Sequence, residues 1–221
     1  MSLDGVKAEL HNEEEANAAA ERVSAGQFVV SSIKPGEKRK QPAPPFTTSS
    51  LQQEAGRKLN FTTARTMQVV QQLYEGVELA GEGTQGLVTY IRTDSVRISD
   101  EALTDLRAYI PERFGNEYLP EQPNVYKGRR DAQDAHEAIR PTDIRRTPES
   151  VKDSLTKEQF NLYRLIYNRF VASQMMPAIY DTLTGELTAN GAVLRFYGEH
   201  KRFAGFTTLY EESTDEESTS A

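Results

Sequence analysis

At Pro177 the sequence changes its hydrophobic period, and this change constrains the fold more than any other feature. Residues 179–200, IYDTLTGELTANGAVLRFYGEH, alternate with a period of two, as β-strands do. Asn190-Gly191, in the middle of this stretch, is typical of a two-residue hairpin turn. The pattern therefore predicts a β-rich C-terminal part.

Before Pro177, apolar residues recur at helical spacing. Thr156, followed three residues later by Gln159, indicates a capping box and predicts a long helix that ends near Met175. Shorter helices are expected over 13–23 and at several later positions. The expected caps of the later helices are Ser49 with Gln52, Thr62 or Thr63, and Ser99. The first two of these helices are expected to end at Leu59 and Gly76, and Pro111 would end or kink the third. The aromatic residues of the long helix are expected in the core, not on a base-stacking surface: Phe160, Tyr163 and Tyr167.

The mostly helical middle lies between two segments with strand character. QFVVSSI (27–33) predicts a strand, and KPGEKRKQPAPPF (34–46) is typical of a proline-rich, basic connector at a domain boundary. We therefore expect an α+β multidomain fold. Residues 1–49 and 177–221 would form one discontinuous β-rich domain that ends in an acidic disordered tail, and residues 50–176 would form a helical domain inserted into it.

The formal net charge of −7 argues at first against a nucleic-acid partner. However, five acidic residues lie in the C-terminal EESTDEESTSA, and subtracting them from −7 leaves −2. Basic residues crowd into one stretch of twenty positions, and local charge decides phosphate affinity. They are Lys127, Arg129, Arg130, Arg140, Arg145 and Arg146, against Asp131, Asp134, Glu137 and Asp143.

The composition narrows the class of protein further. The absence of cysteine excludes disulfides and thiolate metal sites. No apolar run approaches membrane-spanning length, and no secretory leader is recognisable. With 37% hydrophobic residues and a mean hydropathy of −0.63, we expect a soluble, intracellular protein.

GLVTYIRTDS (86–95) concentrates reactive side chains in a strand-like run. In a strand, Val88, Tyr90, Arg92 and Asp94 would share one face. A lone tyrosine in a strand is usually a packed aromatic residue, but a neighbouring guanidinium could hold a phosphodiester while the phenolic oxygen attacks phosphorus. The phosphotyrosine ester would conserve the energy of the broken bond, so the strand could be resealed without ATP.

The remaining groups near Tyr90 leave alternatives open. Phenols have a pKa of about 10, so the hydroxyl must lose its proton during attack, and the sequence identifies no base for it. Asp94 could orient Arg92 for catalysis, although an ordinary ion pair with Arg92 would explain the position of Asp94 equally well. Thr93 and Ser95 are typical of turns and caps, and capping is the better interpretation of Ser95.

DAQDAHEAIRPT places a histidine in a predicted short helix, 132–139, which Pro141 stops. His136 and Arg140 would then lie one turn apart. Arginine stands where a His-Glu-x-x-His zinc site needs its second histidine, so no metal is expected. His136 is either a surface histidine or a phosphate hydrogen-bond donor that works with Arg140. Other arginines nearby are expected to be solvated: Arg129, Arg130, Arg145 and Arg146.

Three segments together resemble the type IA DNA topoisomerases, most closely their bacterial members. These are FTTSSLQQEAGRKLNF (46–61), GLVTYIRTDSVRISDEA (86–102) and DAHEAIRPTD (134–143), which match the family in order and spacing from about residue 20 to 210. The resemblance implies that Tyr90 is the nucleophile and that Arg92 positions the scissile phosphate. His136 would assist DNA binding, with Arg140 beside it. We expect Asp94, on the same predicted face, to support the site.

The resemblance also implies partners and a cofactor. The DNA substrate would be single-stranded or negatively supercoiled, and the β-rich domain would form an arch that lifts during strand passage. Nothing in this chain resembles the acidic run of the family's TOPRIM domain, which binds Mg²⁺ and completes the site. We therefore expect a central fragment that is inactive alone, from a monomeric, cytoplasmic, nucleoid-associated enzyme.

Two other classes are compatible with parts of the pattern. In a passive nucleic-acid-binding module, Tyr90 would only pack. A tyrosine recombinase or a type IB enzyme also combines tyrosine with arginine and histidine, but the residues around these groups match the type IA family instead.

Overall fold

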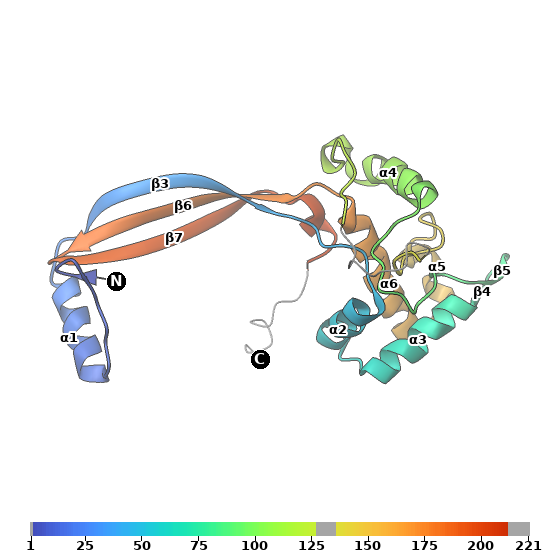
Figure 1. The fold of residues 1–221 in the computed structure, drawn as a ribbon, viewed down its shortest axis with the longest axis horizontal. Coiled ribbons are helices and arrows are strands. Elements are labelled where there is room, and N and C mark those ends of the chain that lie inside the picture. The colour runs from blue at the N-terminus through green and yellow to red at the C-terminus, as the bar shows by residue number, and fades with distance from the viewer. Residues whose placement is uncertain (1, 127–135, 212–221) are drawn as a thin grey trace. The chain divides into compact units, whose positions relative to one another are not determined.

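The computed structural model describes residues 2–126 and 136–211, and it has the mixed α+β content that the sequence predicts (Figure 1). The chain divides into two compact units. The first contains Met1–Lys40 and Ala178–Ala204, and the second contains Gln41–Pro177 and Gly205–Ala221. No helix in the described ranges is long and apolar enough to cross a membrane. The acidic tail from residue 212 onward lies outside the described residues.

The first unit is built on an antiparallel sheet whose strands have the order β2-β1-β7-β6-β3, and Figure 1 shows the three longest strands running side by side. The turn between β6 and β7 contains Asn190 and Gly191, with φ of 47° and 77°. Positive φ at both positions is what a type I′ hairpin requires, so the predicted hairpin is confirmed. The strands are β1 (Ser2–Leu3), β2 (Val6–Lys7), β3 (Val29–Lys40), β6 (Ala178–Ala189) and β7 (Ala192–Phe203).

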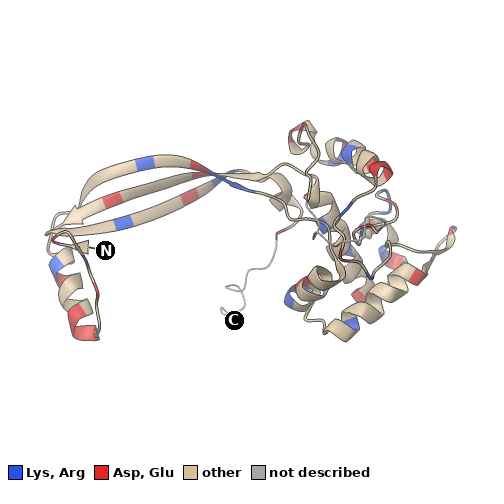
Figure 2. Ribbon diagram, viewed as in Figure 1, with Lys and Arg blue, Asp and Glu red and all other residues tan. Residues whose placement is uncertain are grey.

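Helix α1 (Glu13–Ser24) covers one end of this sheet and confirms the helix predicted over 13–23. The Asn12 side chain caps it by accepting a hydrogen bond from the Glu15 amide at 2.8 Å. Its buried Val23 packs against two sheet residues, Ala189 and Ala192. Acidic residues fill the first turn, where they complement the positive end of the helix dipole, as Figure 2 shows.

Strand β3 extends well beyond the predicted strand, so the connector predicted over 34–46 is wrong for its first half. Pro35 and Gly36 pair with Leu183 and Thr182 inside the strand. Proline is tolerated because β3 is the last strand of the sheet, where a missing N–H leaves no neighbouring acceptor unsatisfied. Charged residues of β3 instead form ion pairs with β7, Lys38 with Glu199 and Glu37 with Arg202. Figure 2 shows charged positions along these strands.

The second unit is mainly helical, and its longest helix supplies much of the core. Tyr163 and Tyr167 are buried as predicted, and Phe160 is half-buried. The hydroxyls of Tyr163 and Tyr167 donate to the carbonyls of Arg146 and Ile144 at 2.6 and 2.8 Å. The helices are α2 (Thr48–Leu59), α3 (Thr63–Glu75), α4 (Asp100–Phe114), α5 (Pro148–Val151) and α6 (Lys157–Ser173), with short 3-10 turns at Asn116–Tyr118, Lys152–Ser154 and Gly205–Thr208 and a small hairpin of β4 (Val77–Leu79) and β5 (Gly83–Gln85).

Most of the predicted helix caps are confirmed. Thr62, Ser99 and Thr156 each cap a helix, and Thr156 forms the predicted capping box. The cap of α2 is Thr47 and not Ser49, because the Thr47 amide donates to the Ser50 hydroxyl at 2.9 Å and completes a box there. A serine in the third helical position performs the role that the prediction assigned to glutamine.

Candidate active site

The segment 86–95 is not a regular strand, which corrects the sequence prediction. Val88 makes a single bridge to Pro141, and several other backbone groups bond to three different segments. The chain therefore satisfies backbone groups here without joining a sheet, and it bends at residues 91 and 92. Its hydrogen bonds include Leu87 N to Leu73 O (2.8 Å) on α3, Thr89 N to Arg140 O (2.9 Å), and Thr48 N on α2 to Thr93 O (2.9 Å).

The predicted alternation of faces nevertheless holds for the reactive residues. Tyr90, Arg92 and Asp94 are exposed, and the residues between and after them, Ile91 and Thr93 among them, are buried. Val88 departs from the prediction because it is buried. The phenol, the guanidinium and the carboxylate are thus all exposed to solvent, although the backbone bends at residues 91 and 92.

Two aromatic rings flank the Tyr90 ring. Tyr74, in the last turn of α3, meets it edge to face, with ring centroids 5.9 Å apart and planes at 70°. His136 approaches with a centroid separation of 5.9 Å and planes at 44°. Tyr90 remains 45% exposed. Its hydroxyl forms no hydrogen bond with any residue in the described ranges, so it is available to an external group.

Arg92 and Asp94 are also uncommitted. Within 2–126 and 136–211, neither forms a hydrogen bond or an ion pair, and they do not pair with each other. An exposed arginine without a protein partner can hold an anionic group bidentately. The exposed residues therefore include a side chain that can act as a nucleophile, Tyr90, and one that can bind phosphate, Arg92.

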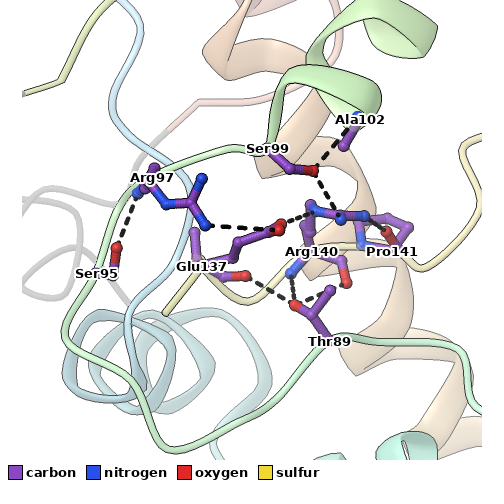
Figure 3. Close-up of polar contacts among 9 residues, drawn as sticks. Thr89, Ser95, Arg97, Ser99, Ala102, Glu137, Arg140 and Pro141 are labelled. Atoms are coloured by element: carbon purple, nitrogen blue, oxygen red, sulfur yellow. Dashed lines mark hydrogen bonds and ion pairs between the residues drawn. The ribbon is translucent and has the colours of Figure 1, made fainter. Parts of the chain in front are cut away.

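A polar network is centred on Glu137 and Arg140 (Figure 3). The Arg140 guanidinium donates from Nε to Glu137 at 2.8 Å, from one terminal nitrogen to the Pro141 carbonyl at 2.9 Å, and from the other to the Ser99 hydroxyl at 3.4 Å. Arg97 lies on the other side of Glu137, with a closest ion-pair distance of 3.9 Å. Glu137 thus bridges two guanidinium groups beside His136.

The Thr89 hydroxyl joins this network to the segment that carries Tyr90 (Figure 3). It donates to the Ala138 carbonyl at 2.7 Å and accepts from the Arg140 amide at 3.0 Å. The residue directly before Tyr90 is therefore fixed to the residues that follow His136. This contact joins the two segments that carry the rings.

Comparison with known proteins decides the family. The model of the family described as DNA topoisomerase matches residues 4–221, nearly the whole chain. The chain belongs to this DNA topoisomerase family. Its structure is similar to that of the full-length topoisomerase I from Thermotoga maritima, with 38% sequence identity and a TM-score of 0.78. The match covers 96% of this chain and 34% of the Thermotoga maritima chain. Both findings support a type IA, bacterial topoisomerase I-like chain that spans about a third of that structure.

The region around His136 in this topoisomerase chain differs from the prediction. Residues 136–140 are not helical, so the helix predicted over 132–139 is wrong for its described part, and its earlier residues lie outside the described ranges. The amides of Ala138 and Ile139 instead donate to the carbonyls of Arg97 and Phe46 at 2.9 and 2.8 Å. These pairings with distant segments prevail over local helical bonds.

Arg140 is placed differently from Arg92. Its side chain is only 13% exposed and is held by the network, whereas Arg92 faces solvent. The geometry favours a supporting role for Arg140, and its contact with DNA stays a prediction. Of the remaining basic stretch, Arg145 pairs with Glu112 at 2.8 Å and Arg146 with Glu82 at 2.9 Å. Lys127, Arg129 and Arg130 lie outside the described residues.

The sequence interpretation missed several residues of the candidate site. Tyr74, Thr89 and Glu137 were assigned no role, yet they make the contacts that surround Tyr90 and His136. Glu137 and Arg140 sit three residues apart in the His-Glu-Ala-Ile-Arg-Pro motif, a spacing that could have suggested an ion pair. No local signal links Tyr74 or Thr89 to their partners, because these contacts join segments distant in sequence.

Proposed function

We propose that Tyr90 is the nucleophile of a type IA DNA topoisomerase and that this chain is the tyrosine-bearing part of the full-length enzyme. The observation that carries the proposal is the Tyr90 side chain, half-exposed between two aromatic rings with an unbonded hydroxyl within the described structure. Arg92, exposed two residues later, supplies the positive charge that a phosphodiester requires.

In the proposed reaction, the phenolic oxygen of Tyr90 attacks the phosphorus of a phosphodiester in single-stranded DNA. The bond from phosphorus to the 3′-oxygen breaks, so the 5′-phosphate is transferred to Tyr90. The phenol loses its proton and the leaving 3′-oxygen gains one. Attack of that 3′-hydroxyl on the phosphotyrosine reverses the exchange, and no ATP is needed because the ester conserves the bond energy. Passage of a strand through the gap relaxes negatively supercoiled DNA.

The residues around Tyr90 take distinct roles in this proposal. The Arg92 guanidinium donates hydrogen bonds to the non-bridging phosphate oxygens and stabilises the charge that develops on them. Asp94 orients Arg92 when DNA is bound. His136, exposed beside the Tyr90 ring, donates to the DNA backbone. Arg140 and Glu137 hold the His136 segment in place through the network of Figure 3.

The metal requirement is assigned to another part of the enzyme. In the described ranges, no three His, Asp or Glu side chains are grouped so that they could hold a metal ion. We propose that acidic residues outside these 221 residues bind Mg²⁺, which stabilises negative charge on the phosphate. On this proposal the 221-residue chain alone neither cleaves nor relaxes DNA, and the full-length enzyme acts as a cytoplasmic, nucleoid-associated monomer.

The test is a cleavage assay with end-labelled single-stranded DNA, Mg²⁺ and the full-length enzyme. DNA labelled at its 3′ end should migrate with the protein, and DNA labelled at its 5′ end should be released free. Tyr90→Phe should abolish both products, and the 221-residue chain should give none. DNA binding without a covalent product in the parent enzyme would instead support a passive binding module. Topoisomers produced by the chain alone would contradict the assigned metal requirement.

A further inference from the structure

The Tyr90 side chain has few constraints of its own. It is 45% exposed, and its hydroxyl has no hydrogen-bond partner in the described structure. A half-exposed aromatic side chain on an extended segment can populate several rotamers. A nucleophile, however, reacts only when its attacking atom is held in line with the bond that breaks. The contacts that restrict its ring therefore bear directly on the rate of attack.

Tyr74 provides a contact from a fixed backbone position, although its side chain is itself 38% exposed. Its ring meets Tyr90 edge to face at 5.9 Å, an arrangement that aromatic pairs prefer. Two hydrogen bonds hold the backbone on either side of Tyr74, where α3 ends. The Leu87 amide donates to the Leu73 carbonyl at 2.8 Å, and the Gly76 amide donates to the Gln72 carbonyl at 3.0 Å. The bond between Leu87 and Leu73 thus joins the Tyr90 segment to the end of α3, next to Tyr74.

Gly86 permits this close approach. A Cβ atom at Gly86 would lie 2.8 Å from the Tyr74 carbonyl oxygen, a separation that real Cβ atoms essentially never show. Only glycine lets the segment pass so near the end of α3. Gly86 therefore allows the backbone approach that brings Tyr74 close to the segment that carries Tyr90.

We infer that Tyr74 is a positioning residue, which restricts the Tyr90 ring to the orientation from which it attacks DNA. The inference rests on the proposed function of Tyr90 and adds a residue to it. Tyr74 acts through its ring and not through its hydroxyl, which has no hydrogen-bond partner in the described ranges. Phenylalanine should therefore replace it, and an aliphatic side chain should not.

The test compares Tyr74→Phe and Tyr74→Leu in the full-length enzyme. Single-turnover cleavage should be about threefold to tenfold slower in Tyr74→Leu, the range expected from losing one aromatic pair, and within about twofold of the parent in Tyr74→Phe. Affinity for single-stranded DNA, measured in the Tyr90→Phe background, should be unchanged by either variant. Tyr197→Leu, which removes another exposed tyrosine with no ring contact to Tyr90, is the matched control and should cleave normally.

A second readout follows the ring itself. With 3-fluorotyrosine at position 90, the ¹⁹F resonance should move in Tyr74→Leu and stay near its parent position in Tyr74→Phe. An unchanged resonance and cleavage rate in Tyr74→Leu would overturn the inference. A loss of DNA affinity equal to the loss of rate would overturn it in favour of base stacking by Tyr74. A parent enzyme without an adduct on Tyr90 would overturn the proposed function. The ¹⁹F resonance would then still test whether the Tyr74 ring restricts the Tyr90 ring.

Discussion

Replacing Thr89 by valine should destabilise the second unit and show how the Tyr90 segment is held. The Thr89 hydroxyl donates to the Ala138 carbonyl at 2.7 Å and accepts from the Arg140 amide at 3.0 Å. Valine has nearly the same shape, so the change removes two hydrogen bonds and leaves no cavity. At about 1 kcal/mol for each bond, the free energy of unfolding should fall by about 2 kcal/mol.

Urea unfolding of the 221-residue chain, followed by circular dichroism at 222 nm, measures this loss. Thr89→Ser keeps the hydroxyl and should recover most of the stability. Thr104→Val is the matched control, because the Thr104 hydroxyl donates to the Asp100 carbonyl at 2.8 Å on an exposed helix surface. Its effect should stay within about 0.5 kcal/mol.

Either of two results would refute the reasoning about Thr89. A Thr89→Val chain as stable as the parent would show that the hydroxyl does not hold the two segments together. Equal losses in Thr89→Val and Thr89→Ser would show that shape, and not hydrogen bonding, matters at this position. In the full-length enzyme, the valine variant should also cleave DNA more slowly, because Thr89 directly precedes Tyr90.

Three further predictions concern charge and ionisation. In the full-length enzyme, Arg92→Ala should slow cleavage about 100-fold or more, whereas Arg145→Ala, which removes only an exposed ion pair, should change it less than about twofold. Equal effects in cleavage assays would contradict the site assignment. Arg140→Gln should lower the free energy of unfolding in urea by about 2 kcal/mol because it leaves Glu137 half-buried without its main partner. Adding Glu137→Gln should recover part of the loss, and strictly additive losses would argue against coupling. Burial raises the pKa of Tyr163 in the folded chain. Its contribution to the free energy of unfolding is therefore complete below the unfolded-state pKa of about 10, and it declines at higher pH because the unfolded chain then loses the phenol proton more readily. Tyr163→Phe should therefore make stability depend less on pH above about 10, and an unchanged alkaline profile would contradict this.

The elements that depend on local chemistry were predictable from the sequence. Asn190-Gly191 can adopt positive φ cheaply, so the hairpin follows from two residues. The caps at Thr62, Ser99 and Thr156 are likewise decided within one helical turn. The alternation of exposed and buried residues from Tyr90 to Ser95 also follows the sequence pattern, although no regular strand forms and the chain bends at residues 91 and 92.

The elements that depend on distant partners were not predictable. The His136 segment has a helical pattern, but its amides bond to Arg97 and Phe46, which are far away in the sequence. Strand β3 runs through Pro35 because β3 lies at the edge of the sheet, a position that sequence alone does not reveal. The Tyr74 ring and the Thr89 hydroxyl have no local feature that marks their contacts with the site.

The most direct test of the central claim is to identify the residue that becomes attached to DNA. The full-length enzyme would be incubated with single-stranded DNA and Mg²⁺, trapped, digested with protease and nuclease, and mapped by mass spectrometry. We expect a nucleotide adduct on Tyr90, with none in Tyr90→Phe. An active full-length enzyme whose adduct lies on another residue would contradict the account, and the segment 86–95 would then serve binding or structure only.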